Sequence, residues 1–313
     1  MHYTSYRAAL RSRFGRPVVK VPVNGGFSCP NRDGTKSTQG CFFCDNRSFS
    51  PAALSGNRTA AEQLASIITR SAGKKRFYLP YLQPFTNTYG TVGELRQVYE
   101  PLLDVKGVIG LAVGTRPDCF TEEIYRYLAD LAKRTYLSIE LGLQSTHDDT
   151  LRQCNRGHTF REFVAATERL ASDGVEVVAH MMLGLPGETP AMMNESAVRL
   201  ADLPCRGVKL HQLMIIKDTP FEKWYHAGRC PVLSIEEYCE LLCFFLSFLR
   251  PDQQIHRLVA DSTVENGLVA PMWSTEKMKA LKAINAYMDR HEFSQGENRR
   301  RGGESFGCDS GRS

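Results

Sequence analysis

Three cysteines near the N-terminus, Cys29, Cys41 and Cys44, have the spacing C-x11-C-x2-C and could hold a metal centre. The segment around them, residues 24–46, is rich in turn-forming residues and has no periodic apolar pattern, which predicts an ordered loop. Three thiolates can hold three corners of a [4Fe-4S] cluster and leave one iron open to another ligand. A C-x2-C pair is also a common zinc signal, although structural zinc takes four ligands and no second such pair follows. The loop alone leaves both metal centres open.

The composition places limits on the protein class. The 313 residues fit one large domain or two ordinary ones, and no apolar run approaches the roughly 20 residues that a membrane span needs. Ten cysteines with no N-terminal signal peptide favour a cytoplasmic protein with thiol or metal chemistry over one with disulfides. A net charge of +5 is compatible with a nucleic-acid substrate, and equally with simple solubility.

Short, almost continuously apolar segments alternate with helical patterns along most of the chain. This alternation predicts an α/β fold in which helices wrap a parallel sheet, either doubly wound or curved like a barrel. The six expected strands are residues 16–23, 76–83, 107–113, 136–143, 175–183 and 207–216.

Polar segments follow these strands at the end where parallel sheets carry their chemistry. They read QPFTNTY, GTRPD, LQS and GLPGE. Glu140 lies inside the fourth strand between apolar neighbours, and a buried carboxylate is costly unless it is paired. We expect it to face the barrel interior as a functional group, with a bond to Arg116 as the alternative.

The pattern changes after residue 233. Residues 1–233 are expected to form the core with its cysteine loop at 24–46, and residues 234–293 an α/β extension packed on it. The last stretch, 294–313, is rich in Gly, Arg, Ser and Glu, which is typical of a disordered tail.

The order of these motifs resembles the radical S-adenosylmethionine (radical SAM) superfamily. The motifs are the cysteine loop after the first strand, then GTRPD, IELGLQS, NRGH and HMMLGLPGE at successive strand ends. Within the superfamily the chain is similar to YhcC-type proteins, to the elongator catalytic subunit and, more distantly, to oxygen-independent coproporphyrinogen oxidase. The usual spacing there is C-x3-C-x2-C, and the longer first spacing here is a feature of the elongator-like branch. The resemblance implies a partial (β/α)6 TIM-type barrel.

The resemblance also implies a chemistry. Cys29, Cys41 and Cys44 would ligate three irons of a [4Fe-4S] cluster, and S-adenosylmethionine would chelate the fourth. An electron from the cluster, supplied by a donor such as flavodoxin or ferredoxin, would cleave the cofactor to methionine and a 5′-deoxyadenosyl radical. That radical would abstract hydrogen from a substrate.

Cofactor contacts follow from the same resemblance. Gln144 matches a residue that meets the ribose, and Arg156, twelve positions later, matches an arginine that pairs with the cofactor carboxylate. His180 stands at a ribose-facing position that is acidic in coproporphyrinogen oxidase, and Leu185 would contact the adenine through its backbone. The full expected set is Thr86, Asn87, Thr115, Glu140, Gln144, Arg156, His180 and Leu185.

The substrate is not identified by these motifs. The elongator-like features and the positive charge favour RNA, as in tRNA modification. Two alternatives stay open: a radical enzyme acting on a small metabolite, and a non-catalytic zinc or iron-sulfur RNA-binding protein.

Overall fold

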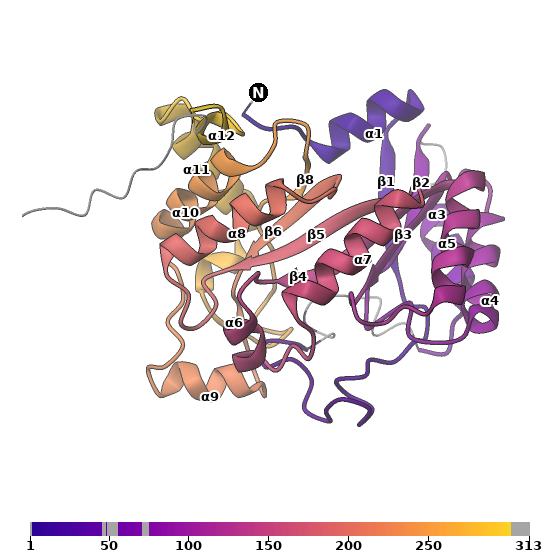
Figure 1. The fold of residues 1–313 in the computed structure, drawn as a ribbon, viewed down its shortest axis with the longest axis horizontal. Coiled ribbons are helices and arrows are strands. Elements are labelled where there is room, and N and C mark those ends of the chain that lie inside the picture. The colour runs from indigo at the N-terminus through magenta and orange to yellow at the C-terminus, as the bar shows by residue number, and fades with distance from the viewer. Residues whose placement is uncertain (1, 46–47, 49–55, 71–74, 302–313) are drawn as a thin grey trace, which may run out of the picture.

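The computed structural model describes residues 2–45, 48, 56–70 and 75–301. Within these residues, seven parallel strands form one curved sheet in the order β1-β2-β3-β4-β5-β6-β8 (Figure 1). The strands are β1 (Val18–Val23), β2 (Phe77–Leu82), β3 (Gly110–Thr115), β4 (Tyr136–Gln144), β5 (Glu176–Leu183), β6 (Gly207–Gln212) and β8 (Gln254–Arg257).

Helices connect successive strands and cover the outer face of the sheet. They are α3 (Ala60–Arg70), α4 (Val92–Leu103), α5 (Glu122–Arg134), α7 (Phe160–Ser172), α8 (Pro190–Ala201) and α10 (Ile235–Phe248). Threonines 91, 121, 159 and 189 begin four of them, and each side chain accepts a hydrogen bond from the third helical N–H. Such caps satisfy backbone donors that a helix start leaves free, so they set where each helix leaves the strand-end loop.

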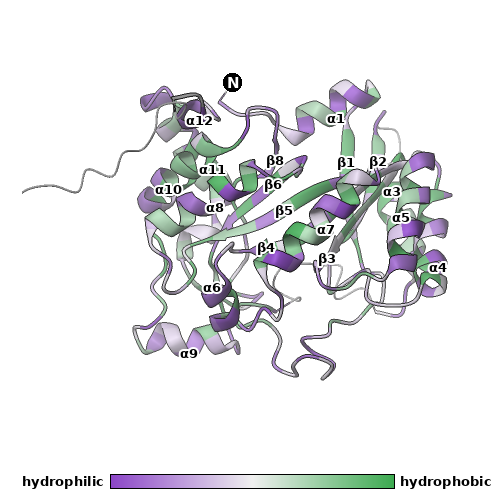
Figure 2. Ribbon diagram, viewed as in Figure 1, coloured by the Kyte–Doolittle hydropathy of each residue, from purple (hydrophilic) through white to green (hydrophobic). Residues whose placement is uncertain are grey.

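Apolar side chains from the strands and from one side of each helix form the main core. Figure 2 shows strands β1 and β2 as mainly hydrophobic and helices such as α5 and α8 as hydrophobic on only part of their surface. Leu128 and Leu131 of α5 are fully buried in the same cluster as Ile139 and Leu141 of β4. This burial fixes which strand residues point outward, so their neighbours must face the inside of the curve.

The remaining elements lie around the two ends of the sheet. They are α1 (Tyr6–Phe14), α6 (Asp148–Gln153), β7 (Ile215–Ile216), α9 (Pro220–His226), β9 (Leu268–Ala270), the 3₁₀ helix η2 (Met272–Thr275), α11 (Lys277–Arg290) and α12 (Glu297–Arg301). Figure 1 shows α1 at one end of the sheet, and α6 and α9 at the other, beside the loop that follows β1. No helix in the described part of the chain is both long and apolar enough to cross a membrane.

The predicted α/β fold of parallel strands is confirmed, and the sequential strand order selects the barrel-like curve over the doubly wound sheet. The sheet has one strand more than expected. Strand β8, which lies within residues 234–293, pairs with β6 and extends the sheet, since Gly207 and Val208 lie opposite Gln254 and Ile255.

Residues 295–301, which were expected in the disordered tail, are ordered. Gln295 is buried and donates to the carbonyl oxygens of Arg250 and Gln253, and α12 follows it. Arg299 pairs with Asp202 at 2.8 Å. Hydrogen bonds from a single buried glutamine thus anchor residues whose composition alone suggested disorder; residues 302–313 lie outside the described part.

Candidate functional site

The cysteine loop leaves β1 and folds across the carboxyl ends of the strands. Cys41 is buried, Cys29 and Cys44 are half-buried, and all three thiols are free. The Phe42 N–H donates to the carbonyl oxygen of Cys154 at 3.0 Å, and the Phe42 ring packs against Trp224 of α9. These contacts place an apolar wall beside the cysteines, which limits the access of water.

The three thiols lie close enough to influence one another. Burial and the charges of Cys41 and Cys29 raise the pKa of Cys44 to about 11, against a lowering by Arg32. Among the described residues, no three His, Cys, Asp or Glu side chains are grouped to hold one metal ion. Three neighbouring thiols are the donor set that holds three corners of a [4Fe-4S] cluster, where bound iron keeps each sulfur as a thiolate.

Two asparagines fasten the cysteine loop to the segment after β4. The buried Asn31 donates to the carbonyl oxygens of Asn155 (2.6 Å) and Arg156 (3.2 Å), and its amide nitrogen lies 3.6 Å from Sγ of Cys41. Asn155 donates in return to the carbonyl oxygen of Gly40 at 2.8 Å. Because these bonds come from both sides, the position of Cys41 is set before any metal binds.

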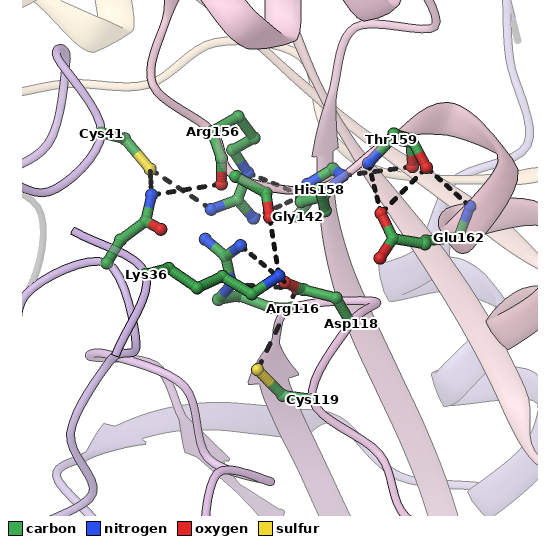
Figure 3. A network of polar contacts seen from close by, with 12 residues as sticks. Lys36, Cys41, Arg116, Asp118, Cys119, Gly142, Arg156, His158, Thr159 and Glu162 are labelled. Atoms are coloured by element: carbon green, nitrogen blue, oxygen red, sulfur yellow. Dashed lines mark hydrogen bonds and ion pairs between the residues drawn. The ribbon is translucent and has the colours of Figure 1, made fainter. Parts of the chain in front are cut away.

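A buried ion pair provides a second attachment (Figure 3). Arg116 donates two hydrogen bonds to Asp118, at 2.9 and 2.8 Å, and both side chains are 2% exposed. Lys36 of the cysteine loop donates to Asp118 and to the carbonyl oxygen of Gly157. Burial would raise the pKa of Asp118, but the bonds and charges of Arg116 and Lys36 lower it to about 2. The carboxylate therefore stays ionised and links the loop to the end of β3.

Arg156 joins the loop to β4. Its Nε donates to the carbonyl oxygen of Gly142 at 3.1 Å, and its Nη1 lies 3.4 Å from Sγ of Cys41. A side chain at Gly142 would place its Cβ 2.5 Å from Nη2 of Arg156, so glycine leaves the space that the guanidinium occupies. The His158 Nε2 lies 3.0 Å from the same carbonyl oxygen, and Figure 3 shows both contacts as dashed lines.

A pocket opens between the cysteine loop and the inside of the curved sheet. It is lined by all three cysteines and by six of the eight residues expected to contact the cofactor: Thr86, Thr115, Glu140, Gln144, Arg156 and His180. Among the described polar atoms that are buried without a hydrogen-bond partner are Thr86 Oγ1 and Gln144 Oε1 of this pocket. Buried polar groups are normally satisfied, so these atoms fit a polar ligand in the pocket. Gln144 also has a left-handed backbone (φ 79°) at an irregularity in the β4–β5 pairing, and such strain gathers at functional sites.

The other two residues expected to contact the cofactor, Asn87 and Leu185, do not line this pocket. Asn87 is fully buried and donates to the carbonyl oxygens of Leu82, Pro84 and Gly114. It therefore braces the turn after β2. Leu185 is buried in an apolar cluster with Cys41 and neighbouring side chains, behind the cysteine loop.

Glu140 faces the inside of the curved sheet, which was the favoured of the two expectations. Its partner is not Arg116, which was the alternative. It accepts from Lys209 of β6 at 3.0 Å, from Lys20 of β1, and contacts His180 of β5 at 2.8 Å. Arg116 is instead committed to Asp118. The alternative was wrong because Arg116 follows β3 at its end, whereas Glu140 sits deeper in β4 opposite Gly114.

The comparison with family models decides the class of this site. A model of the radical SAM superfamily matches residues 32–200, and the Radical_SAM C-terminal domain matches residues 205–290. The chain belongs to the radical SAM superfamily. Radical SAM proteins use a [4Fe-4S] cluster and S-adenosylmethionine, and the cysteine loop with its adjoining pocket fits both.

Individual relatives agree with this assignment. YtqA of Bacillus subtilis is 39% identical, over 94% of this chain and 92% of that protein. YhcC of Escherichia coli is 36% identical, over 90% of this chain and 91% of that protein. The structure of Elp3 from Methanocaldococcus infernus has a TM-score of 0.65 at 16% identity, over 91% of this chain and 68% of that one. This radical SAM fold is thus shared with an elongator-type protein.

The sequence did not reveal the contacts of Asn31 and Asn155. It also did not reveal that the basic side chains of Lys209 and Arg257 line the pocket. Asn31 stands two residues after Cys29, where it resembles an ordinary turn residue. Arg257 lies in β8, a strand that was expected outside the barrel. A cue was available for Lys209 and His211, because alternate residues of β6 must share a face with its neighbours in the sheet.

Proposed function

We propose that this protein cleaves S-adenosylmethionine reductively and uses the product to remove a hydrogen atom from a substrate, with tRNA as the leading candidate. The observation that carries the proposal is the pocket that the three cysteines share with unpartnered polar atoms of β4 and of the turn after β2. When bound, the cluster and S-adenosylmethionine supply a 5′-deoxyadenosyl radical.

The chain's own residues would bind and orient the cluster and S-adenosylmethionine and shield them from water. Cys29, Cys41 and Cys44 hold the cluster. Arg156, already beside Cys41, presents a planar guanidinium that suits the cofactor carboxylate. Gln144 offers its buried oxygen to a ribose hydroxyl, and Thr86 offers its oxygen to the amino group.

Thr115, His180 and Glu140 complete the proposed cofactor contacts along the strand ends and inner wall. Leu185 and Asn87 would support the site without lining it. Leu185 packs in the apolar cluster that contains Cys41, and Asn87 holds the turn after β2 through its hydrogen bonds.

The first test is anaerobic reconstitution with iron and sulfide, followed by dithionite and S-adenosylmethionine, with 5′-deoxyadenosine measured by mass spectrometry. We expect formation by the wild type and loss of at least a hundredfold in Cys41→Ala. Cys243→Ala is the matched control, because this thiol is also buried but lies in α10. A full cluster without any 5′-deoxyadenosine would contradict the proposal and favour a non-catalytic iron-sulfur protein.

The substrate is tested in the same assay. The likeness to an elongator-type structure and the net charge of +5 support tRNA. Total tRNA should raise 5′-deoxyadenosine formation severalfold in the presence of a biological donor such as flavodoxin or ferredoxin. Stimulation by a metabolite extract depleted of RNA, and none by tRNA, would select the small-metabolite alternative.

A further inference from the structure

The inner wall of the pocket carries basic side chains from three strands. Lys209 of β6 and Arg257 of β8 line the pocket together with the three cysteines, and they are paired neighbours in the sheet. Lys20 of β1 adjoins them, with its Nζ 3.9 Å from the centre of the Tyr81 ring, on which Nζ of Lys209 also lies at 4.6 Å.

The carboxylates that line this wall already have partners. Glu140 contacts Lys20, Lys209 and His180. The other lining carboxylate, Asp261, is half-exposed and pairs with Lys277 at 2.6 Å. Within the described residues, the buried Nε of Arg257 has no hydrogen-bond partner.

The wall therefore holds more positive charge than it can satisfy. Burial, followed by the charges of Lys209 and Arg257, holds the pKa of Lys20 well below its usual range. Burial likewise lowers the pKa of Arg257. Arg257 is partly buried and its buried Nε is left unsatisfied, which costs stability, so the stability of the sheet does not explain the presence of Arg257. An anion bound to this wall would stabilise the buried positive charges and would give Nε of Arg257 a hydrogen-bond partner.

We propose that Arg257 and Lys209 bind an oxyanion of the substrate, a carboxylate or a phosphate. This inference rests on the proposed function, since it assigns the substrate end of the same pocket. Arg156 is bound to the loop side, to Cys41 and Gly142, and is the candidate for the cofactor carboxylate. Arg257 ends β8 at the edge of the sheet, whereas Arg156 follows β4 beside the cysteine loop, so the pocket has separate cationic groups for two anions. A substrate held there by its acidic group would direct a C–H bond toward the cysteine loop.

The test uses the reconstituted protein with an oxidised cluster and bound S-adenosylmethionine, so that no turnover occurs. Inorganic phosphate is followed by ³¹P line width and carboxyl-labelled acetate by ¹³C line width. We expect saturable broadening by at least one of them. Arg257→Met keeps the aliphatic stem and should raise the dissociation constant of that anion at least tenfold. Arg206→Met, a half-exposed arginine just before β6, is the matched control and should change it less than twofold.

The outcomes separate the possibilities. Broadening by phosphate alone, by acetate alone or by both supports the site and names the acidic group. Equal broadening in wild type and Arg257→Met overturns the inference. So does a parallel tenfold loss of S-adenosylmethionine affinity, because Arg257 would then hold the cofactor. Formation of 5′-deoxyadenosine by a protein that binds neither anion leaves the proposed function standing and removes only this inference.

A stability measurement gives an independent reading. If Arg257 is kept for a ligand, Arg257→Met should raise the midpoint of thermal unfolding of the ligand-free protein by a few degrees, because it removes a partly buried cation whose Nε has no hydrogen-bond partner. If Arg257 is a structural residue, the same change should lower that midpoint.

Discussion

Nη1 of Arg156 lies 3.4 Å from Sγ of Cys41, while Nε of the same guanidinium donates to the carbonyl oxygen of Gly142. One side chain thus connects Cys41 of the cysteine loop to β4. Donors near a thiolate stabilise its negative charge, and hydrogen bonds to ligating sulfurs tune a cluster. The arrangement makes Arg156 a residue that both positions the loop and faces the cofactor pocket.

Replacing this arginine with lysine should separate charge from shape. In Arg156→Lys we expect iron to bind, because the three cysteines are intact. The affinity for S-adenosylmethionine should fall at least tenfold, because an ammonium cannot give the planar, two-pronged contact to a carboxylate. Iron content and equilibrium dialysis measure the two effects. Arg152→Lys is the control, with a side chain 71% exposed, and unchanged affinity in Arg156→Lys would remove Arg156 from the cofactor site.

Gly157 should tolerate no side chain. Its φ is +72°, and an added Cβ would lie 2.6 Å from Oδ1 of Asn31 and 3.3 Å from Nη2 of Arg116. Gly174 has a similar φ of +77° with nothing within 4 Å of the same atom, so Gly174→Ala isolates the backbone cost of about 1 kcal/mol. Gly157→Ala should lose about 2 kcal/mol more in urea unfolding and retain less iron after reconstitution. Equal losses in the two variants would show that the Asn31 contact is unimportant.

Much of the fold could be predicted because its signals are local. Apolar strands such as the one containing Ile139 and Leu141 alternate with capped amphipathic helices, and that alternation is enough to predict a parallel α/β sheet. Residues 255–259 were predicted as a strand of the C-terminal extension, but the place of β8 in the main sheet escaped prediction, because this strand is four residues long and reads QIHR, with one apolar residue. Its pairing depends on the open edge of β6, which is a tertiary feature.

Sequence spacing and motif order singled out the three cysteines, Gln144 and Arg156, which all line one pocket. The site was not predictable where the contact joins distant segments. Asn31 and Asn155 are separated by 124 positions, and no local pattern relates them. Lys20 and Glu140 likewise meet only because β1 and β4 curve around the same interior.

The ion pair beneath the loop should be important for stability. Asp118→Asn leaves Arg116 and Lys36 without their shared carboxylate, and we expect a loss of about 3 kcal/mol in the free energy of unfolding. Urea titration measures it. Asp149→Asn removes a carboxylate that is 90% exposed and pairs with Arg152, so it should cost less than about 0.5 kcal/mol. Similar losses in both variants would mean that the buried pair is no stronger than a surface one.

Stability should also fall on mild acidification because His158 is buried as the neutral imidazole. Burial, then the charges of Arg156 and Arg116, lower its pKa to about 3, although Asp118 opposes them. The unfolded chain takes up a proton near pH 6.5 and the folded chain does not, so stability present above pH 6.5 is lost as the pH falls toward 3.

His158→Gln removes this contribution. Between pH 7.5 and 5.5 the metal-free variant should lose about 1.4 kcal/mol less stability in urea than the wild type does, from the difference in proton uptake alone. His226→Gln, at a side chain 64% exposed, should keep the wild-type dependence. If the His158 variant also keeps it, the folded and unfolded chains protonate this imidazole equally, and its burial has no pH-dependent cost. A larger loss in the His158 variant than in the wild type would mean that the pKa of the folded imidazole is raised, with a charge-assisted contact to the Gly142 carbonyl.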